Sequence, residues 1–123
     1  MKNPASYFEI PVLDIERAVQ FYSAVFGYHF VKEQIHGNEM ALFPIYEGQE
    51  GISGALAQGE IYVPSKNGSL IYLNSSDIDD TLSKVQLNGG AVLLPMTPVG
   101  ELGFVAEFED SEGNRIALFQ NHE

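Results

Sequence analysis

Hydrophobic residues recur at helical spacing in two segments of the chain, and the first begins just after Asp14. It carries an apolar stripe formed by Ile15, Val19, Tyr22 and Phe26. An Asp at this point can cap the first turn of a helix with its side-chain oxygen. The glycine that follows Phe26 can end the helix because it tolerates a left-handed conformation. The pattern therefore predicts a helix between these two residues.

The second segment repeats the first one 63 residues further along the chain, with Asp77 in the place of Asp14. Ile78, Leu82 and Val85 form its apolar stripe, and a Gly-Gly pair at positions 89 and 90 follows. A strand–helix–strand pattern that occurs twice in a short chain predicts two copies of one small module. Paired modules tend to build a cavity between them, where a ligand site is expected.

Short alternating segments flank both predicted helices, and their period of two predicts strands. These strands are expected near residues 6–12, 28–34, 39–46, 52–58, 69–75, 91–97, 103–109 and 115–120. The order is β-α-β-β-β twice, which predicts an α+β fold. The modules span about residues 1–58 and 69–123, within one domain of 123 residues. Each module alone would bury too little apolar surface to be an independent domain.

The alternation also assigns a face to each side chain. In the first strand, Phe8, Ile10 and Val12 share the side that is expected to carry the helices, whereas Tyr7 and Glu9 point the other way. A mixture of tyrosine, carboxylate, amide, guanidinium and phenyl groups on that other side suits a cavity lining better than a dry core. The later strands add to it Tyr72, Asn74, Glu107, Arg115 and Phe119.

Charge and composition narrow the classes of function. Six basic and seventeen acidic side chains give a formal charge of −11, which disfavours binding to nucleic acids and anionic membrane surfaces. The chain has no cysteine, which excludes disulfides, thiolate metal sites and a cysteine nucleophile. No stretch approaches the length that spans a membrane, and no signal sequence is evident. These features predict a cytoplasmic protein.

Three segments of this pattern carry a resemblance to a known family: Ile10–Asp14, Phe21–Gly27 and Asp110–Phe119. The chain resembles the vicinal oxygen chelate superfamily, which contains glyoxalase I, bleomycin-resistance proteins and extradiol dioxygenases. It is most similar to the branch related to lactoylglutathione lyase. The resemblance implies a glyoxalase-like fold, with two βαβββ modules around a U-shaped cavity, and commonly a homodimer.

Metal enzymes of this family hold a divalent ion with histidine and carboxylate side chains on the cavity face. The positions that match those ligands carry Tyr7, Leu70, Ala117 and Phe43 here. Leucine and alanine have no lone pair to donate, so the usual metal site is expected to be absent, and no cofactor is expected. None of the three histidines falls at a ligand position. Chelation by atypical ligands remains an alternative, because the chain has many carboxylates.

Two carboxylates are the candidates for catalysis without a metal. Pairing across a turn at Asp110–Asn114 would place Glu107 near Ala117, on the face that carries Glu9. Carboxylates close together raise the pKa of one of them, which is a starting point for acid–base chemistry. Arg115 would pair with these acids or bind an anionic ligand. The predicted ligand-binding residues are Tyr7, Phe43, Tyr72, Asn74, Arg115 and Phe119.

Three classes of function fit these residues. The first is a module that binds a small organic ligand without a metal. The second is a lyase or isomerase that acts on a small carbonyl compound through Glu9 or Glu107. The third is a dimerisation scaffold whose own side chains fill the cavity. The fold alone does not decide among them, because one scaffold can host several chemistries.

Overall fold

The structure, a computed structural model, describes residues 1–122. Two helices and eight strands follow one another in the predicted order. The first module contains β1 (Phe8–Val12), α1 (Ile15–Phe26), β2 (Val31–Ile35), β3 (Asn38–Leu42) and β4 (Gly54–Gln58). The second contains β5 (Tyr72–Asn74), α2 (Ile78–Leu87), β6 (Ala91–Pro98), β7 (Gly103–Glu109) and β8 (Arg115–Asn121).

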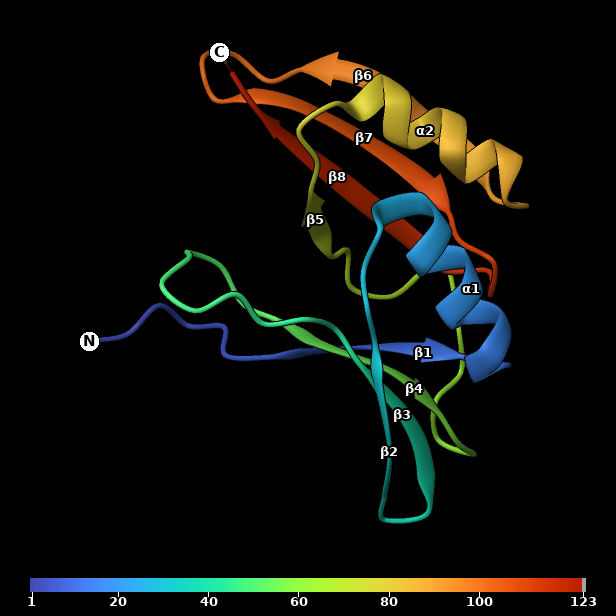
Figure 1. The fold of residues 1–123 in the computed structure, drawn as a ribbon. Helices are drawn as coiled ribbons and strands as arrows, with labels where there is room; N and C mark the ends of the chain where they lie inside the picture. The colour runs from blue at the N-terminus through green and yellow to red at the C-terminus, as the bar shows by residue number, and fades with distance from the viewer. Residues whose placement is uncertain (123) are drawn as a thin grey trace.

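Each module folds into a four-stranded mixed sheet, and the two sheets have the same strand order (Figure 1). The orders are β1-β4-β3-β2 and β5-β8-β7-β6. In the first sheet β1 runs parallel to β4, and in the second sheet β5 runs parallel to β8. The remaining pairs are antiparallel. The predicted α+β class and the repeated βαβββ order are therefore confirmed.

The predicted helix ends are present in the first module. The side chain of Asp14 accepts hydrogen bonds of 3.1 Å from the backbone N–H groups of Glu16 and Arg17. Gly27 ends α1 with φ of 78°, a left-handed conformation that few other residues adopt without strain. In the second module, Asp77 accepts a hydrogen bond of 3.1 Å from the N–H of Asp80.

A glutamine at the end of the last strand of each module satisfies a further donor at the helix start. Gln58 accepts a 2.7 Å hydrogen bond from the N–H of Ile15, and Gln120 accepts a 2.8 Å bond from the N–H of Ile78. The first N–H groups of a helix have no partner within the helix, so these side chains replace water there. The repeat is therefore present in the hydrogen bonds as well as in the topology.

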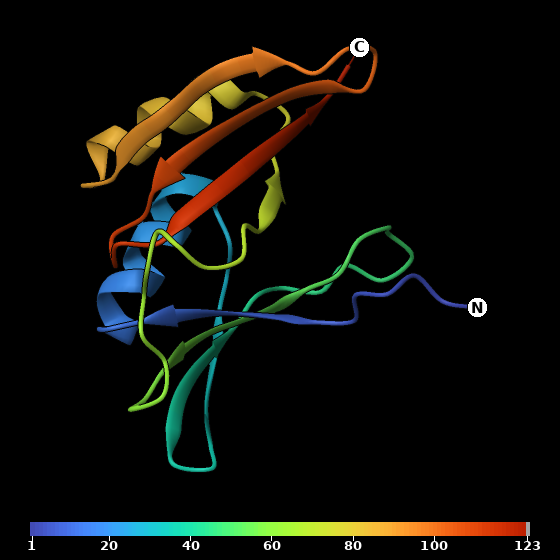
Figure 2. The ribbon, with the colours of Figure 1, turned by 180° about the vertical axis from the view of Figure 1, so that it is seen from behind.

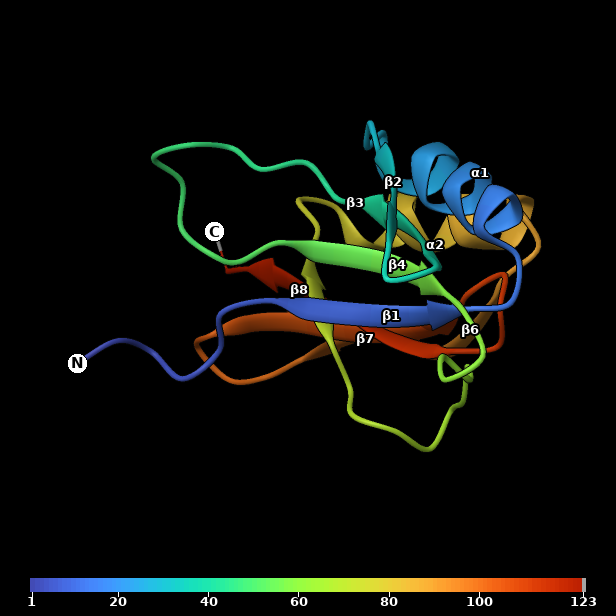
Figure 3. The ribbon, with the colours of Figure 1, turned by 90° about the horizontal axis from the view of Figure 1, so that it is seen from below.

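Both helices lie on the same side of the two sheets and share one continuous core (Figure 3). The core draws side chains from both modules, including Ile10 and Tyr22 from the first and Phe108 and Leu118 from the second. The predicted alternation holds in β1, where Ile10 is 1% exposed, whereas Tyr7 just before the strand is 51% exposed.

The turn between β7 and β8 joins the second module to the first. The buried carboxylate of Glu112 accepts 2.9 Å hydrogen bonds from the backbone N–H groups of Leu13 and Asp14. It also pairs with Arg17, at 2.7 Å from Nε. The segment that connects β4 to β5 passes from one sheet to the other (Figure 2). Asn114 holds this segment to the turn, because its side chain accepts a 3.1 Å hydrogen bond from the backbone N–H of residue 65.

Several predicted strands are shorter in the structure, and the largest difference lies at residues 43–53. The strands expected at 39–46 and 52–58 end at Leu42 and begin at Gly54, so the residues between them form a loop. Pro44 has no N–H to donate to a sheet, and the glycines at 48 and 51 have φ of 76° and 99°, outside the strand region. A 2.9 Å bond from the hydroxyl of Ser53 to the carbonyl of Pro44 closes the base of this loop.

The strands expected at 28–34 and 69–75 begin later, at Val31 and Tyr72. Within residues 1–122, no helix is long and apolar enough to cross a membrane.

Candidate functional site

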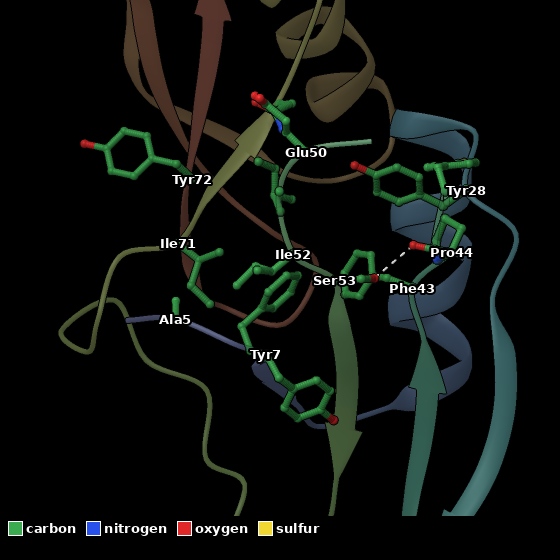
Figure 4. A pocket seen from close by; sticks show the side chains of 15 residues that line it. Ala5, Tyr7, Tyr28, Phe43, Pro44, Glu50, Ile52, Ser53, Ile71 and Tyr72 are labelled. Carbon is green, nitrogen blue, oxygen red and sulfur yellow. Dashed lines mark hydrogen bonds between the residues drawn. The ribbon is translucent and has the colours of Figure 1, made fainter. Parts of the chain in front are cut away.

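A cavity of about 630 Å³ lies between the two modules, at the start of β1 and β5. The loop at residues 43–53 forms one of its walls, and residues 71–74 form the opposite one. Figure 4 shows Ile71 on one side of the cavity and Tyr28 and Phe43 on the other, with Glu50 at one end, whereas the ring of Tyr72 extends outward from the side of Ile71. The lining includes six aromatic residues, Tyr7, Phe8, Tyr28, Phe43, Tyr46 and Tyr72.

The floor of the cavity is a packed aromatic cluster. The ring of Phe43 lies 5.3 Å from that of Phe8 and 5.5 Å from that of Tyr28, measured between centroids. Phe43 also contacts Tyr22 in the core, at 5.9 Å with nearly perpendicular rings. Such edge-to-face packing fixes the ring positions. A ligand in the cavity would therefore meet a preformed surface.

The mouth of the cavity is apolar and open to solvent. Tyr46 is 64% exposed, Tyr72 is 52% exposed and Ile52 is 48% exposed. These residues come from the 43–53 loop and from β5, so the two modules provide opposite sides of the mouth. Exposed apolar side chains that line a cavity mouth mark a place where another apolar surface can bind.

Two tyrosines of the cavity, Tyr28 and Tyr7, have raised pKa values. Burial, and then the neighbouring Tyr46, raise the pKa of Tyr28 to about 12. Burial and the hydrogen bond to Glu9 raise the pKa of Tyr7 to about 12 as well. Both phenols therefore keep their protons. The lining adds the polar groups of Ser53, Asn74 and Glu50.

The structure brings together four of the six predicted ligand-binding residues. Tyr7, Phe43, Tyr72 and Asn74 all line the cavity. Arg115 lies elsewhere and lines a smaller cavity of about 180 Å³. Phe119 lies beside Asn74 in the sheet, because the two residues are register partners in β8 and β5.

The two predicted catalytic carboxylates have separate partners. Glu9 accepts hydrogen bonds from two phenols, 3.0 Å from Tyr7 and 2.8 Å from Tyr62. Glu107 pairs with Arg115, at 2.8 Å from Nε and 2.7 Å from Nη2. Glu9 and Arg115 line the smaller cavity together. A catalytic role for Glu9 and Glu107 stays a prediction.

Sequence reasoning missed several of the residues that shape this region. Tyr28, Tyr46 and Ile52 line the cavity but fall in segments that were expected to be strands. Tyr62 lies in the connecting segment, which is not a strand, so the period-two alternation of side chains does not predict where its side chain points. A signal for the loop was present in the sequence, since Pro44 and the two glycines that follow are typical of a break between strands.

The residues at the family's metal-ligand positions do not fit a divalent ion. Ala117 is fully buried and lies opposite Tyr72 in the sheet, and position 70 carries leucine. Tyr7 offers a protonated phenol that already donates a hydrogen bond to Glu9. Among residues 1–122, no group of three or more His, Cys, Asp or Glu side chains is placed to hold a metal.

The fold and the cavity between paired modules define a class of protein, and comparison with known families agrees. The family model of the Glyoxalase/Bleomycin resistance protein/Dioxygenase superfamily matches residues 5–118. The chain therefore belongs to this superfamily. It is 32% identical over 117 residues to a glyoxylase-like domain-containing protein of Didymella fabae, covering 92% of this chain and 90% of that protein.

Solved structures share the fold at lower sequence identity. A glyoxylase/bleomycin resistance protein/dioxygenase domain from Frankia sp. EAN1pec has a TM-score of 0.76 and 13% identity, with 99% of this chain and 100% of that chain covered. TnmS3, an antibiotic-binding protein from Streptomyces sp. CB03234, has a TM-score of 0.69 and 22% identity, with 98% of both chains covered. At these identities the likeness concerns the fold alone.

Proposed function

We propose that this protein binds a small, largely apolar organic molecule in the aromatic cavity, without using a metal ion. The cavity itself carries the proposal. Its volume of about 630 Å³ lies within the range of about 300–1,000 Å³ that is usual for small-molecule sites. Six aromatic side chains and a few polar groups line it, which is the composition of such sites.

Three of the predicted ligand-binding residues have distinct roles in this proposal. Phe43 provides the rigid floor, Tyr72 provides a wall at the mouth, and Tyr7 provides a phenol near the acid Glu9. The antibiotic-binding description of TnmS3, which has the same fold, supports binding as a function of such a scaffold.

Capture of metabolites tests the proposal. The protein is purified under native conditions, and the organic compounds that it retains are identified by mass spectrometry. We expect the unmodified protein to retain one compound in stoichiometric amount. The Tyr72→Ala variant should lose this compound, because the substitution removes a half-exposed side chain that lines the cavity. Leu93→Ala is the matched control, since Leu93 is 42% exposed and is not one of the lining residues. Equal retention by both variants would refute this site.

A lyase or isomerase activity through Glu9 is the second candidate. One observation favours it: Tyr7 lines the cavity and donates a hydrogen bond of 3.0 Å to Glu9, so this phenol connects the carboxylate to the cavity lining. Glu107 has no comparable link, because its described partner is Arg115. In an enzyme, Glu9→Gln would abolish turnover of the captured compound and leave its binding intact, whereas a binding module would show no turnover in either form.

The proposal includes a homodimer, which the family resemblance implies. Apolar side chains support it, since Ile45 is 78% exposed, Ile61 is 77% exposed and Val63 is 70% exposed. Exposed apolar side chains can be covered by a second copy of the chain. Sedimentation equilibrium measures the mass in solution directly, and a monomer at all concentrations would contradict this part of the proposal.

A further inference from the structure

The only charged side chain among the lining residues of the aromatic cavity is a carboxylate. Its lining residues include the carboxylate of Glu50 and no lysine, arginine or histidine. Glu9 adds a second carboxylate behind Tyr7. The chain as a whole carries a formal charge of −11. A ligand that enters the cavity therefore approaches through a negative field.

Most basic side chains of the protein are paired with acids. Of the six basic residues in the chain, five are ion-paired with acids outside the cavity lining. Arg115 pairs with Glu107 at 2.7 Å, and Lys66 pairs with Glu109 at 3.2 Å. The sixth, Lys2, is not one of the lining residues. An anionic group in the cavity would thus lose its hydration without gaining a positive partner.

The aromatic lining favours the opposite charge. The faces of phenol and phenyl rings are electron-rich and attract cations that lie within about 6 Å of a ring centroid. Tyr28 lies on the opposite side of the cavity from β5, which carries Tyr72, and Tyr46 belongs to the 43–53 loop. Because a flat aromatic ligand stacks well on such rings, one ligand can use both its own ring and its charge.

We propose, building on the ligand-binding function above, that the cavity selects planar aromatic ligands that carry a positive charge. Arylalkylamines, which are protonated at neutral pH, are the simplest members of this class. Glu50 lies at the end of the cavity, where it would face the ammonium group, while the aromatic floor around Phe43 would hold the ring.

A matched ligand series tests the charge preference by isothermal titration calorimetry. The series is 1-naphthylmethylamine, 1-naphthylmethanol and the anion of 1-naphthylacetic acid. The three compounds share one ring system and are cationic, neutral and anionic, respectively. We expect the amine to bind at least about tenfold more tightly than the acetate, with the alcohol between them. Equal affinity for all three would overturn the inference and leave the binding function standing.

Substitution of Glu50 separates its role from the net charge. Glu50→Gln should weaken binding of the amine by about two- to fivefold, as for a charge pair near solvent, and leave the alcohol unchanged. Glu101→Gln is the control, because it removes the same charge from the exposed turn between β6 and β7. Unchanged affinity for the amine in Glu50→Gln would contradict the inference. If no member of the series binds and metabolite capture retains nothing, the binding function itself fails.

Discussion

The hydroxyl of Tyr22 donates a 2.6 Å hydrogen bond to the carboxylate of Asp110, which is 88 residues away in the sequence. Tyr22 belongs to α1 of the first module, and Asp110 begins the turn between the last two strands of the second. Both are buried, at 0% and 3% exposed. This bond therefore joins the modules inside their shared core.

Removing this donor should destabilise the protein. Tyr22→Phe keeps the ring in the core but takes one of the hydrogen bonds away from a buried carboxylate, which should cost about 1–3 kcal/mol of the free energy of unfolding. Urea unfolding measures the difference. Tyr46→Phe is the control. Tyr46 is 64% exposed, so removal of its hydroxyl should leave the free energy of unfolding nearly unchanged. A similar small effect in both variants would show that the bond contributes little.

The pair between Arg17 and Glu112 should make stability depend on pH. Burial raises the pKa of Glu112, but hydrogen bonds from Arg17, Asp14, Ser111 and Leu13 outweigh it, so the net shift is downward. A lowered pKa means that the folded state favours the carboxylate. The resulting stabilisation is present above the pKa of the unfolded chain and is lost as pH falls through the folded-state value.

Glu112→Gln should therefore cost about 1–3 kcal/mol at neutral pH and progressively less in acid. Urea unfolding of both proteins between neutral and acidic pH measures this difference. A cost that stays constant or grows as the pH falls would contradict the assignment. Glu101→Gln, in an exposed turn, serves as the control for the change in net charge.

The two glutamines at the helix starts should stabilise the folded protein by similar free energies. Gln58→Ala and Gln120→Ala each remove the acceptor for the first N–H of a helix, which should cost about 1 kcal/mol in each case. The sites belong to different modules, so the effects should add in the double variant. Thermal unfolding of the four proteins checks this, and a cost at only one site would show that the modules use the repeat differently.

Removal of metal ions should leave ligand binding unchanged. The positions of the family's ligands carry residues that cannot hold a divalent ion, so dialysis against EDTA should not alter the affinity for 1-naphthylmethylamine. Elemental analysis of the purified protein accompanies the titration. A stoichiometric transition metal, or loss of binding that added metal restores, would contradict the proposed metal-independent site.

The sequence predicted the elements that depend on local rules. Asp14 and Gly27 mark the ends of α1 because capping and left-handed backbone are properties of single residues. The open face that carries Glu9 follows from alternation alone. The superfamily was also predicted from the residues, and the family model confirms it.

The shape of the cavity could not be predicted in the same way. Its wall at residues 43–53 contains Tyr46 and Ile52, whose side chains resemble those of strand positions. The ends of the strands also depend on the pairing of β4 with β1 and β3, and this pairing is a long-range property. Tyr62 reaches Glu9 across 53 residues for the same reason. Contacts between distant segments therefore determine the site.

Tyrosine NMR tests the central claim most directly, because the chain has six tyrosines and no tryptophan. Four of them, Tyr7, Tyr28, Tyr46 and Tyr72, line the cavity, whereas Tyr22 lies in the core and Tyr62 lies in the connecting segment. With ring-labelled tyrosine, titration with 1-naphthylmethanol should shift the resonances of the four and leave the other two unchanged. Shifts confined to Tyr22 and Tyr62, or no shifts at saturating ligand, would contradict a ligand site in this cavity.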